Sequence, residues 1–206
     1  MSVFDPVEQS ENIDSKIIAG LERIARVFRF LLWDVAKNEN LSPIQIQFLI
    51  FLLFNNPSRT RITDIANEFS LTKATVSDAI ASLEAKNLII KDKDPEDRRN
   101  YILQLTPKGK KLARKLSIWA DALKNNLKKF NQKDKETILE FILKLIESLY
   151  EAGIITTQRM CFSCAYFQKN VSPKSDAPHY CNLLNKPLSL VELRLDCEDY
   201  EPAVME

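Results

Sequence analysis

The sequence predicts a mainly α-helical protein that contains a helix-turn-helix, a two-stranded hairpin and a small cysteine-rich module. Apolar residues recur at helical spacing through most of residues 13–149. The pattern changes only around residues 88–103, where short apolar runs are typical of strands. All four cysteines lie in the last quarter of the 206 residues, where the helical pattern has ended. We therefore expect a helical domain over residues 1–155 and a separate cysteine module over residues 156–206.

The first two helices are predicted from their apolar stripes and their ends. One stripe runs from Ile17 to Val35, and the asparagines at 38 and 40 end that helix. Ser42 and Pro43 then start a second helix, since serine caps a helix and proline suits its first position. This helix ends before Asn55.

A short helix, a tight turn and a further helix follow. The short helix is expected over residues 62–69, and Ser70 and Leu71 form the turn. Thr72 caps the next helix, which runs to about Lys86 and ends at Asn87 in a left-handed conformation. Strands at 88–90 and 101–103 enclose a charged tip over residues 91–100. This order of elements is that of a winged helix-turn-helix.

Two more helices complete the helical domain. Thr106 and Pro107 start a long helix whose stripe extends to Leu127, and a last helix ends at Gly153. The long N- and C-terminal helices carry more apolar surface than one small lobe can cover. We expect them to be dimerisation helices that bury this surface in a homodimer; the alternative is a bundle within one chain.

Composition argues against an enzyme. Three glycines cannot build a phosphate-binding loop, and a single histidine makes a Ser-His-Asp site improbable. The N-terminus lacks the features of a secretory signal, and no apolar run is long enough to cross a bilayer. We expect a cytoplasmic protein that does not contact a membrane.

Local charge favours double-stranded DNA as a partner. Residues 59–115 hold thirteen Lys or Arg and eight acids, a net +5 in a chain whose total is +1. The N-terminal part of a second helix in such a pair enters the major groove. The candidate DNA-binding residues lie there and at the hairpin tip: Thr72, Lys73, Thr75, Ser77, Asp78, Asp97, Arg98 and Arg99. The alternative is a helical bundle with a charged surface hairpin.

Residues 62–66, 71–80, 83–89, 97–99 and 105–109 together resemble the MarR family of bacterial transcriptional regulators. The resemblance covers residues 12–152. It implies a homodimer that binds a pseudo-palindromic operator. We expect the protein to act as a repressor. It also implies that Asp97 holds Arg99 in the minor groove.

Two features of the chain qualify what this resemblance implies. Asp78 stands where such proteins often carry a base; it could accept a hydrogen bond from a cytosine amine, or simply pair with a surface cation. The resemblance also implies a small-molecule effector pocket, with Phe28, Phe51 and Trp119 as candidate lining residues. We favour the simpler interpretation that these three side chains are hydrophobic core.

The four cysteines predict a metal centre. Cys161 and Cys164 form a Cys-x-x-Cys pair, and Cys181 and Cys197 complete a set of four. A segment of this length cannot build a stable core alone, so a metal would stabilise it. The alternatives are two disulfides or four free thiols, and the expected reducing compartment argues against the disulfides.

The cysteine segments around Tyr166, Tyr180 and Tyr200 resemble the small high-potential-type iron–sulfur modules. That resemblance implies one [4Fe–4S] cluster, which would sense redox state. Zinc, the alternative, would only stabilise the fold. His179 could replace a thiolate, but a supporting position is the more common one for such a histidine. We expect a DNA-binding regulator; the alternative function is an iron–sulfur electron-transfer or protein-interaction adaptor.

Overall fold

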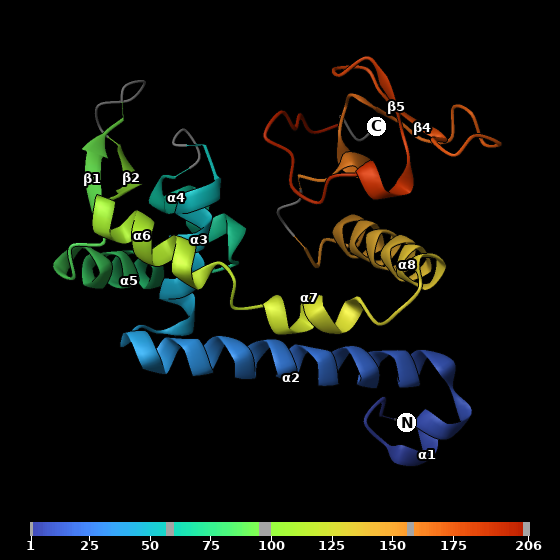
Figure 1. Ribbon diagram of the computed structural model, residues 1–206, viewed down its shortest axis with the longest axis horizontal. Coiled ribbons are helices and arrows are strands. Elements are labelled where there is room, and N and C mark those ends of the chain that lie inside the picture. Colours follow the sequence, from blue (N-terminus) through green and yellow to red (C-terminus); the bar gives the residue numbers. More distant parts are fainter. Residues whose placement is uncertain (1, 57–59, 95–99, 156–158, 204–206) are drawn as a thin grey trace. The chain divides into compact units, whose positions relative to one another are not determined.

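The computed structural model describes residues 2–56, 60–94, 100–155 and 159–203. Figure 1 shows the order of its elements along the chain. Two compact units are formed, each from several stretches of sequence. The first comprises residues 1–54, 79–90 and 105–124, and the second comprises residues 55–78, 91–104 and 125–206.

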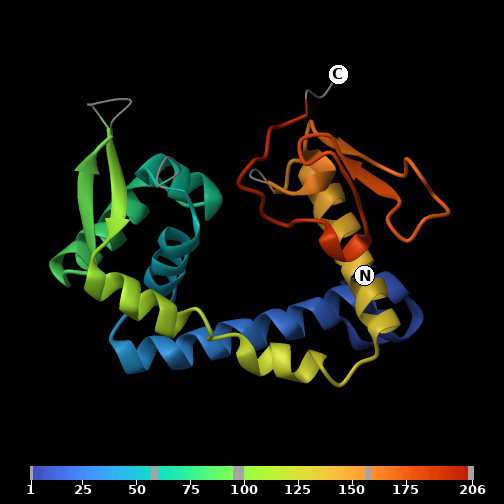
Figure 2. The same cartoon turned by 45° about the horizontal axis from the view of Figure 1, so that its top comes forward.

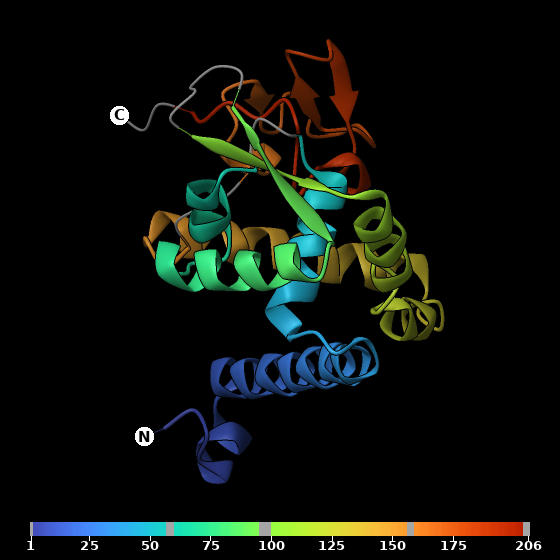
Figure 3. The ribbon, with the colours of Figure 1, turned by 90° about the vertical axis from the view of Figure 1, so that its left-hand side faces the viewer.

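The first unit begins with a helix that the sequence analysis did not predict. Helix α1 (Pro6–Glu11) starts where the Asp5 carboxylate accepts a hydrogen bond from Val7 N–H. It contacts α2 (Ile13–Glu39), the long helix that was predicted over 13–35 (Figure 3). Asn12 caps α2 at one end, and Asn40 ends it in the left-handed conformation.

The core of the first unit lies around α3 (Pro43–Phe54). Ile46, Phe48 and Leu49 of this helix are completely buried, and α3 packs against α6 (Pro107–Leu116). Thr106 caps α6: its hydroxyl accepts from Gly109 N–H at 2.9 Å and donates to Asn87 C=O. A Cβ at Gly109 would lie 1.9 Å from the Leu88 carbonyl oxygen, so this helix approaches the chain too closely for any other residue.

The long helix expected after Thr106 is interrupted. Helix α6 ends at Leu116, and a separate helix, α7, spans Asp121–Leu127. Between them Trp119 N–H bonds to Leu116 C=O and Asp121 N–H bonds to Ile118 C=O, which is a tighter winding than an α-helix allows. The break places the Trp119 ring edge-on against Phe28, with 5.8 Å between ring centroids.

The helix-turn-helix and the hairpin follow the predicted order. Helix α4 (Ile62–Glu68) is followed by Ser70 in the left-handed conformation and by α5 (Lys73–Ala85). Asn87 is left-handed as predicted. Strands β1 (Ile89–Lys93) and β2 (Tyr101–Leu105) pair in a two-stranded sheet, and both are longer than predicted (Figure 2). The predicted winged helix-turn-helix is therefore confirmed.

In the second unit, α8 (Gln132–Glu151) supports the cysteine segment. Leu143 of α8 is buried in one cluster with Met160, Leu188 and Leu193. The segment itself forms a small sheet in the order β3 (Phe167–Gln168), β4 (His179–Cys181) and β5 (Lys186–Leu188). Two single-turn helices, η2 (Cys161–Ser163) and η3 (Leu190–Glu192), flank it. The domain boundary predicted at residue 155 thus falls between α8 and Met160, Leu188 and Leu193, although all of them belong to one hydrophobic cluster.

Candidate DNA interface and four-cysteine site

The start of α5 presents polar side chains to solvent. Lys73, Thr75 and Asp78 are exposed, Ser77 is half-buried, and Val76 points into the core. Thr72 caps the helix through its hydroxyl, which accepts from Thr75 N–H at 3.1 Å. The structure therefore places these five predicted residues at one helix N-terminus, where backbone N–H groups favour an anion such as phosphate.

The hairpin carries the remaining candidates. Asp97, Arg98 and Arg99 lie outside the described residues. The end of β1 next to the hairpin tip is held by Arg61, the residue before α4, whose guanidinium bonds the carboxylate of Asp94, which directly follows β1. Asp94 is buried, and its N–H donates to Asn100 C=O at 3.0 Å, which closes the hairpin below its tip.

Several cations counted in the basic stretch are engaged within the protein. Lys86 donates to the Asn40 carbonyl, Lys108 donates to the Lys86 carbonyl, and Lys115 pairs with Glu39. Together with Arg61, they stabilise the fold. The local charge count therefore overstates the number of cations available to DNA, because sequence alone cannot distinguish an internal ion pair from an exposed cation.

The three candidate pocket residues are not equivalent. Phe51 is buried in α3, whereas Phe28 is 42% exposed and lies edge-on to the half-buried Trp119. The structure thus brings Phe28 and Trp119 together. Their role in binding a small-molecule effector stays a prediction.

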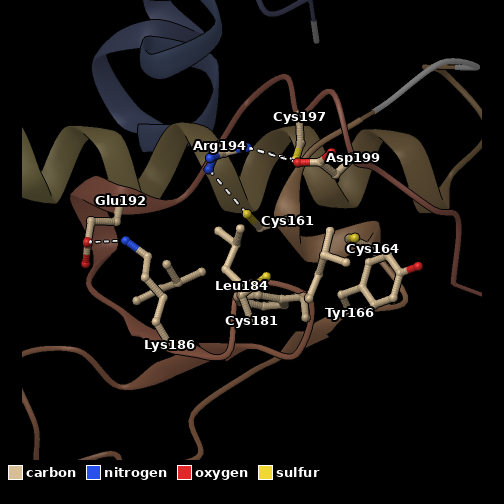
Figure 4. Close-up of a pocket in the computed structure, with 13 residues that line it drawn as sticks. Cys161, Cys164, Tyr166, Cys181, Leu184, Lys186, Glu192, Arg194, Cys197 and Asp199 are labelled. Atoms are coloured by element: carbon tan, nitrogen blue, oxygen red, sulfur yellow. Dashed lines mark hydrogen bonds and ion pairs between the residues drawn. The ribbon is translucent and has the colours of Figure 1, made fainter.

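The four cysteines line one cavity of about 180 Å³, shown in Figure 4. All four are free thiols and half-buried. Leucines and aromatic rings form part of the wall, and the other lining residues are charged: Lys186, Glu192, Arg194 and Asp199. Within the described ranges, no three His, Cys, Asp or Glu side chains are arranged to hold a metal ion. The thiols thus surround a space rather than converge on a point.

Short local structures position each cysteine. Helix η2 turns the chain so that Cys164 N–H bonds Cys161 C=O at 3.0 Å. Cys181 ends β4 and pairs with Phe167 on β3. Cys197 N–H bonds the Arg159 carbonyl at 3.0 Å. Segments far apart in sequence are therefore brought to the same cavity by backbone hydrogen bonds.

The surroundings of Cys161 oppose its ionisation when no metal is present. Burial raises the pKa of this thiol, and the other three cysteines raise it further. The N–H of Arg194 donates to Cys161 Sγ at 3.3 Å and acts in the opposite direction.

His179 belongs to an aromatic cluster beside the cavity. Its ring lies between Phe162 and Phe167, with centroid distances of 6.3 and 5.2 Å, and its Nδ1 accepts from Asn170 N–H. Burial lowers the pKa of His179, and the nearby Lys169 lowers it further. His179 does not line the cavity. These contacts fit the supporting position rather than a metal ligand.

The fold contains a winged helix, and comparison with known proteins shows which of them it resembles. Residues 41–101 match the MarR family. The chain is 26% identical over 122 residues to the HTH-type transcriptional regulator YfiV of Bacillus subtilis, covering 59% of this chain and 76% of that protein. It is 28% identical over 82 residues to a transcriptional regulatory protein for the hcr operon of Thauera aromatica, covering 40% of this chain and 48% of that one.

Solved structures show the same fold. The Staphylococcus aureus MepR–DNA complex matches with a TM-score of 0.55 and 23% identity, over 63% of this chain and 94% of that one. S. aureus MarR in complex with salicylate and kanamycin matches with a TM-score of 0.59 and 19% identity, over 71% of this chain and 99% of that one. Residues 41–101 thus match the MarR family model, and these structures share the fold of the chain. Since MarR is covered almost completely, this chain has residues beyond the shared fold.

A search of the described residues finds no helix long and apolar enough to span a membrane.

Proposed function

We propose that the protein is a homodimeric regulator that binds pseudo-palindromic operator DNA and whose DNA binding responds to a metal centre on the four cysteines. The observation that carries the first part is the exposed start of α5, with Lys73, Thr75 and Asp78 presented on a MarR-type winged helix. A similar fold has been solved in complex with DNA. In that arrangement Lys73 would neutralise a phosphate, and Thr75 and Asp78 would face base edges.

The hairpin would supply the second contact. With the tip end of β1 held by Arg61 through Asp94, the hairpin would carry Arg98 and Arg99 toward the minor groove, and Asp97 would orient Arg99. An arginine held in this way binds a narrow minor groove without a large loss of side-chain entropy.

The homodimer is supported by the exposed face of α2. Apolar side chains along one stripe of this helix are exposed to an extent that a monomer in water would not favour: Ile17 36%, Leu21 37%, Ile24 51% and Phe28 42% exposed. Burying such a face against a second copy gives a closed two-fold assembly. Two winged helices related by that axis would match the two halves of a pseudo-palindrome.

The DNA-binding part is tested with duplexes selected from a random pool by the wild-type protein. Arg99→Ala should weaken binding to the selected duplex by about tenfold or more, because one good contact is worth about 1–3 kcal/mol. Lys174→Ala, which removes an exposed cation from the cysteine module, is the control and should bind like wild type. Equal affinities for Arg99→Ala and wild type at matched salt would refute the wing assignment.

For the metal centre we propose a [4Fe–4S] cluster in preference to zinc. Four thiolates on one zinc lie 2.3 Å from the ion and hence within about 4 Å of one another. The cavity of about 180 Å³ between the cysteines instead suits a larger polynuclear group. When bound, such a cluster supplies one-electron redox chemistry. The residues of this chain would hold it with Cys161, Cys164, Cys181 and Cys197 and exclude water from one side with Phe167 and the leucines.

The metal is tested on protein purified without oxygen. About four irons and four sulfides per chain, with a brown colour, support the cluster, whereas one zinc per chain and no colour would support a structural metal. Each Cys→Ser variant should then lose most of the metal. A wild-type protein with neither metal, even after reconstitution with iron and sulfide or with zinc, would refute the metal centre but leave the DNA-binding proposal standing.

A further inference from the structure

Arg194 links two of the four cysteines that lie far apart in the sequence. Its backbone N–H donates to Cys161 Sγ at 3.3 Å, and its carbonyl accepts from Cys161 N–H at 3.1 Å. Its guanidinium donates from Nη1 to Cys197 Sγ at 3.4 Å. Figure 4 shows Arg194 beside both sulfurs, with a dashed line to each. The sequence analysis did not identify this residue, because nothing in the cysteine spacing marks it.

The guanidinium is itself held in place. Asp199 lies 3.8 Å from Nη1, and the side chain of Arg194 lines the cavity at 45% exposure. Arg194, Cys197 and Asp199 lie on one short stretch of chain. The ligand Cys197 and the neighbouring guanidinium of Arg194 would therefore move together with this stretch of backbone.

A cation and N–H donors beside sulfur have a definite effect on a bound metal centre. Hydrogen bonds from outside the ligand set orient thiolates, withdraw negative charge from them and thereby set the reduction potential of an iron–sulfur cluster. They favour whichever state carries more negative charge, which is the reduced one. The same contacts keep a thiolate ligand in place against its replacement by a chelator.

We propose that Arg194 is the positioning residue of the four-cysteine site: it fixes Cys197 against the metal centre and shifts the redox equilibrium toward the reduced form. This inference rests on the metal centre of the proposed function. It goes beyond that function because it assigns the tuning of the site to a residue that is not a ligand.

Lys186 provides a matched control within the same cavity. It is also a cation that lines the space between the cysteines, and its Nζ pairs with Glu192 at 3.0 Å. If any positive charge near the cavity were sufficient, Lys186→Gln and Arg194→Gln would have similar effects. If the contact with sulfur matters, Arg194→Gln will change the site more than Lys186→Gln.

The experiment compares wild type, Arg194→Gln, Arg194→Lys and Lys186→Gln after anaerobic reconstitution. Metal and sulfide per chain are measured first, followed by the rate of metal release to EDTA and, for an iron-loaded protein, the midpoint potential. Far-ultraviolet circular dichroism checks that each variant is folded. Because the backbone N–H of residue 194 remains in every variant, the comparison isolates the guanidinium.

We expect Arg194→Gln to release metal about tenfold faster than wild type, since one hydrogen bond to a charged group is lost. Its redox equilibrium should shift about tenfold toward the oxidised form, which is 59 mV for one electron. Arg194→Lys should recover part of both effects, and Lys186→Gln should change each of them clearly less than Arg194→Gln does.

The outcomes separate the two proposals. If wild type holds metal but Arg194→Gln matches it in release rate and, where iron is bound, in potential, the role of Arg194 is refuted and the metal centre stands. If Lys186→Gln changes as much as Arg194→Gln, charge alone is sufficient and the positioning role is likewise refuted. If wild type holds no metal, the metal centre itself is refuted. For a zinc-loaded protein the release rates alone decide, because zinc has no redox step.

Discussion

Arg61 and Asp94 form an ion pair, with 2.5 Å between guanidinium and carboxylate, that joins the start of α4 to the tip end of the hairpin's first strand. The two residues are 33 positions apart in sequence. The Asp94 side chain is 3% exposed, whereas that of Arg61 is 30% exposed. The pair therefore fixes the direction in which the hairpin leaves the helix-turn-helix, and the more deeply buried partner is the carboxylate.

Removing Arg61 should destabilise the winged helix. Arg61→Ala leaves a buried carboxylate without this cation, which we expect to lower the free energy of unfolding by about 2 kcal/mol. Urea unfolding followed by circular dichroism measures this loss. Arg114→Ala, an exposed arginine on α6, should change it by less than about 0.5 kcal/mol. A loss of the same size in both variants would show that the pair contributes nothing specific.

The junction of Leu88, Thr106 and Gly109 should tolerate little change. Thr106→Ala removes the cap of α6, at an expected cost of about 1–2 kcal/mol, whereas Thr106→Ser keeps the hydroxyl and should cost less. Gly109→Ala places a Cβ 1.9 Å from a carbonyl oxygen, and we expect it to be the most destabilising of the three. Thermal unfolding ranks them, and a Gly109→Ala protein as stable as wild type would contradict this packing.

Leu143 of α8 should be essential to the cysteine module. Leu143→Ala opens a space between α8 and Met160, Leu188 and Leu193, at an expected cost of about 2–5 kcal/mol. We also expect faster release of bound metal to EDTA, because Met160 immediately precedes Cys161. Ile154→Ala, which truncates a side chain that is 70% exposed, is the control. If metal release is unchanged in Leu143→Ala, the module is independent of α8.

Glu192 should stabilise the module in a pH-dependent way. Hydrogen bonds from the Ser189 backbone, then from Lys186 and the Ser189 hydroxyl, lower the pKa of this carboxyl to about 2. Because the value in an unfolded chain is about 4.3, the stabilisation is complete above that pH and is lost as the pH falls toward about 2.

The measurement is the difference in melting temperature between wild type and Glu192→Gln. We expect it to be constant from pH 8 to pH 5 and to shrink below about pH 4.3. Glu11→Gln, at an exposed position on α1, provides the comparison. A difference that is already falling at pH 6 would mean that another group is responsible.

Much of the helical part could be predicted because its signals are local. The caps at Thr106 and Asn87 and the apolar stripe of α2 fix helix positions within a few residues of sequence. The break before Asp121 was not predicted, because the apolar stripe continues through it and the contact of Trp119 with Phe28, nearly a hundred residues away, leaves no local signal. The ion pair of Arg61 and Asp94 was counted as surface charge for the same reason.

In the cysteine module too, some features could be predicted from the sequence and others could not. The spacing of the cysteines predicted that they would lie together, and they line one cavity. Arg194 and Leu143 were missed because their contributions come from tertiary contacts with Cys161, Cys197 and Met160. A sequence pattern can identify ligands by their chemistry, but a residue that supports them can be of any type that fits.

The most direct test of the proposed function compares the metal-loaded and metal-free forms of the same protein on the same DNA. A duplex is first selected from a random pool by the loaded protein without oxygen, and its affinity is measured by fluorescence anisotropy at fixed salt. The metal is then removed, and the Cys197→Ser variant is measured alongside. We predict an affinity change of about tenfold or more between the two forms, with Cys197→Ser matching the metal-free protein. Equal affinities for loaded, metal-free and Cys197→Ser protein would contradict a regulator whose DNA binding responds to its four-cysteine site.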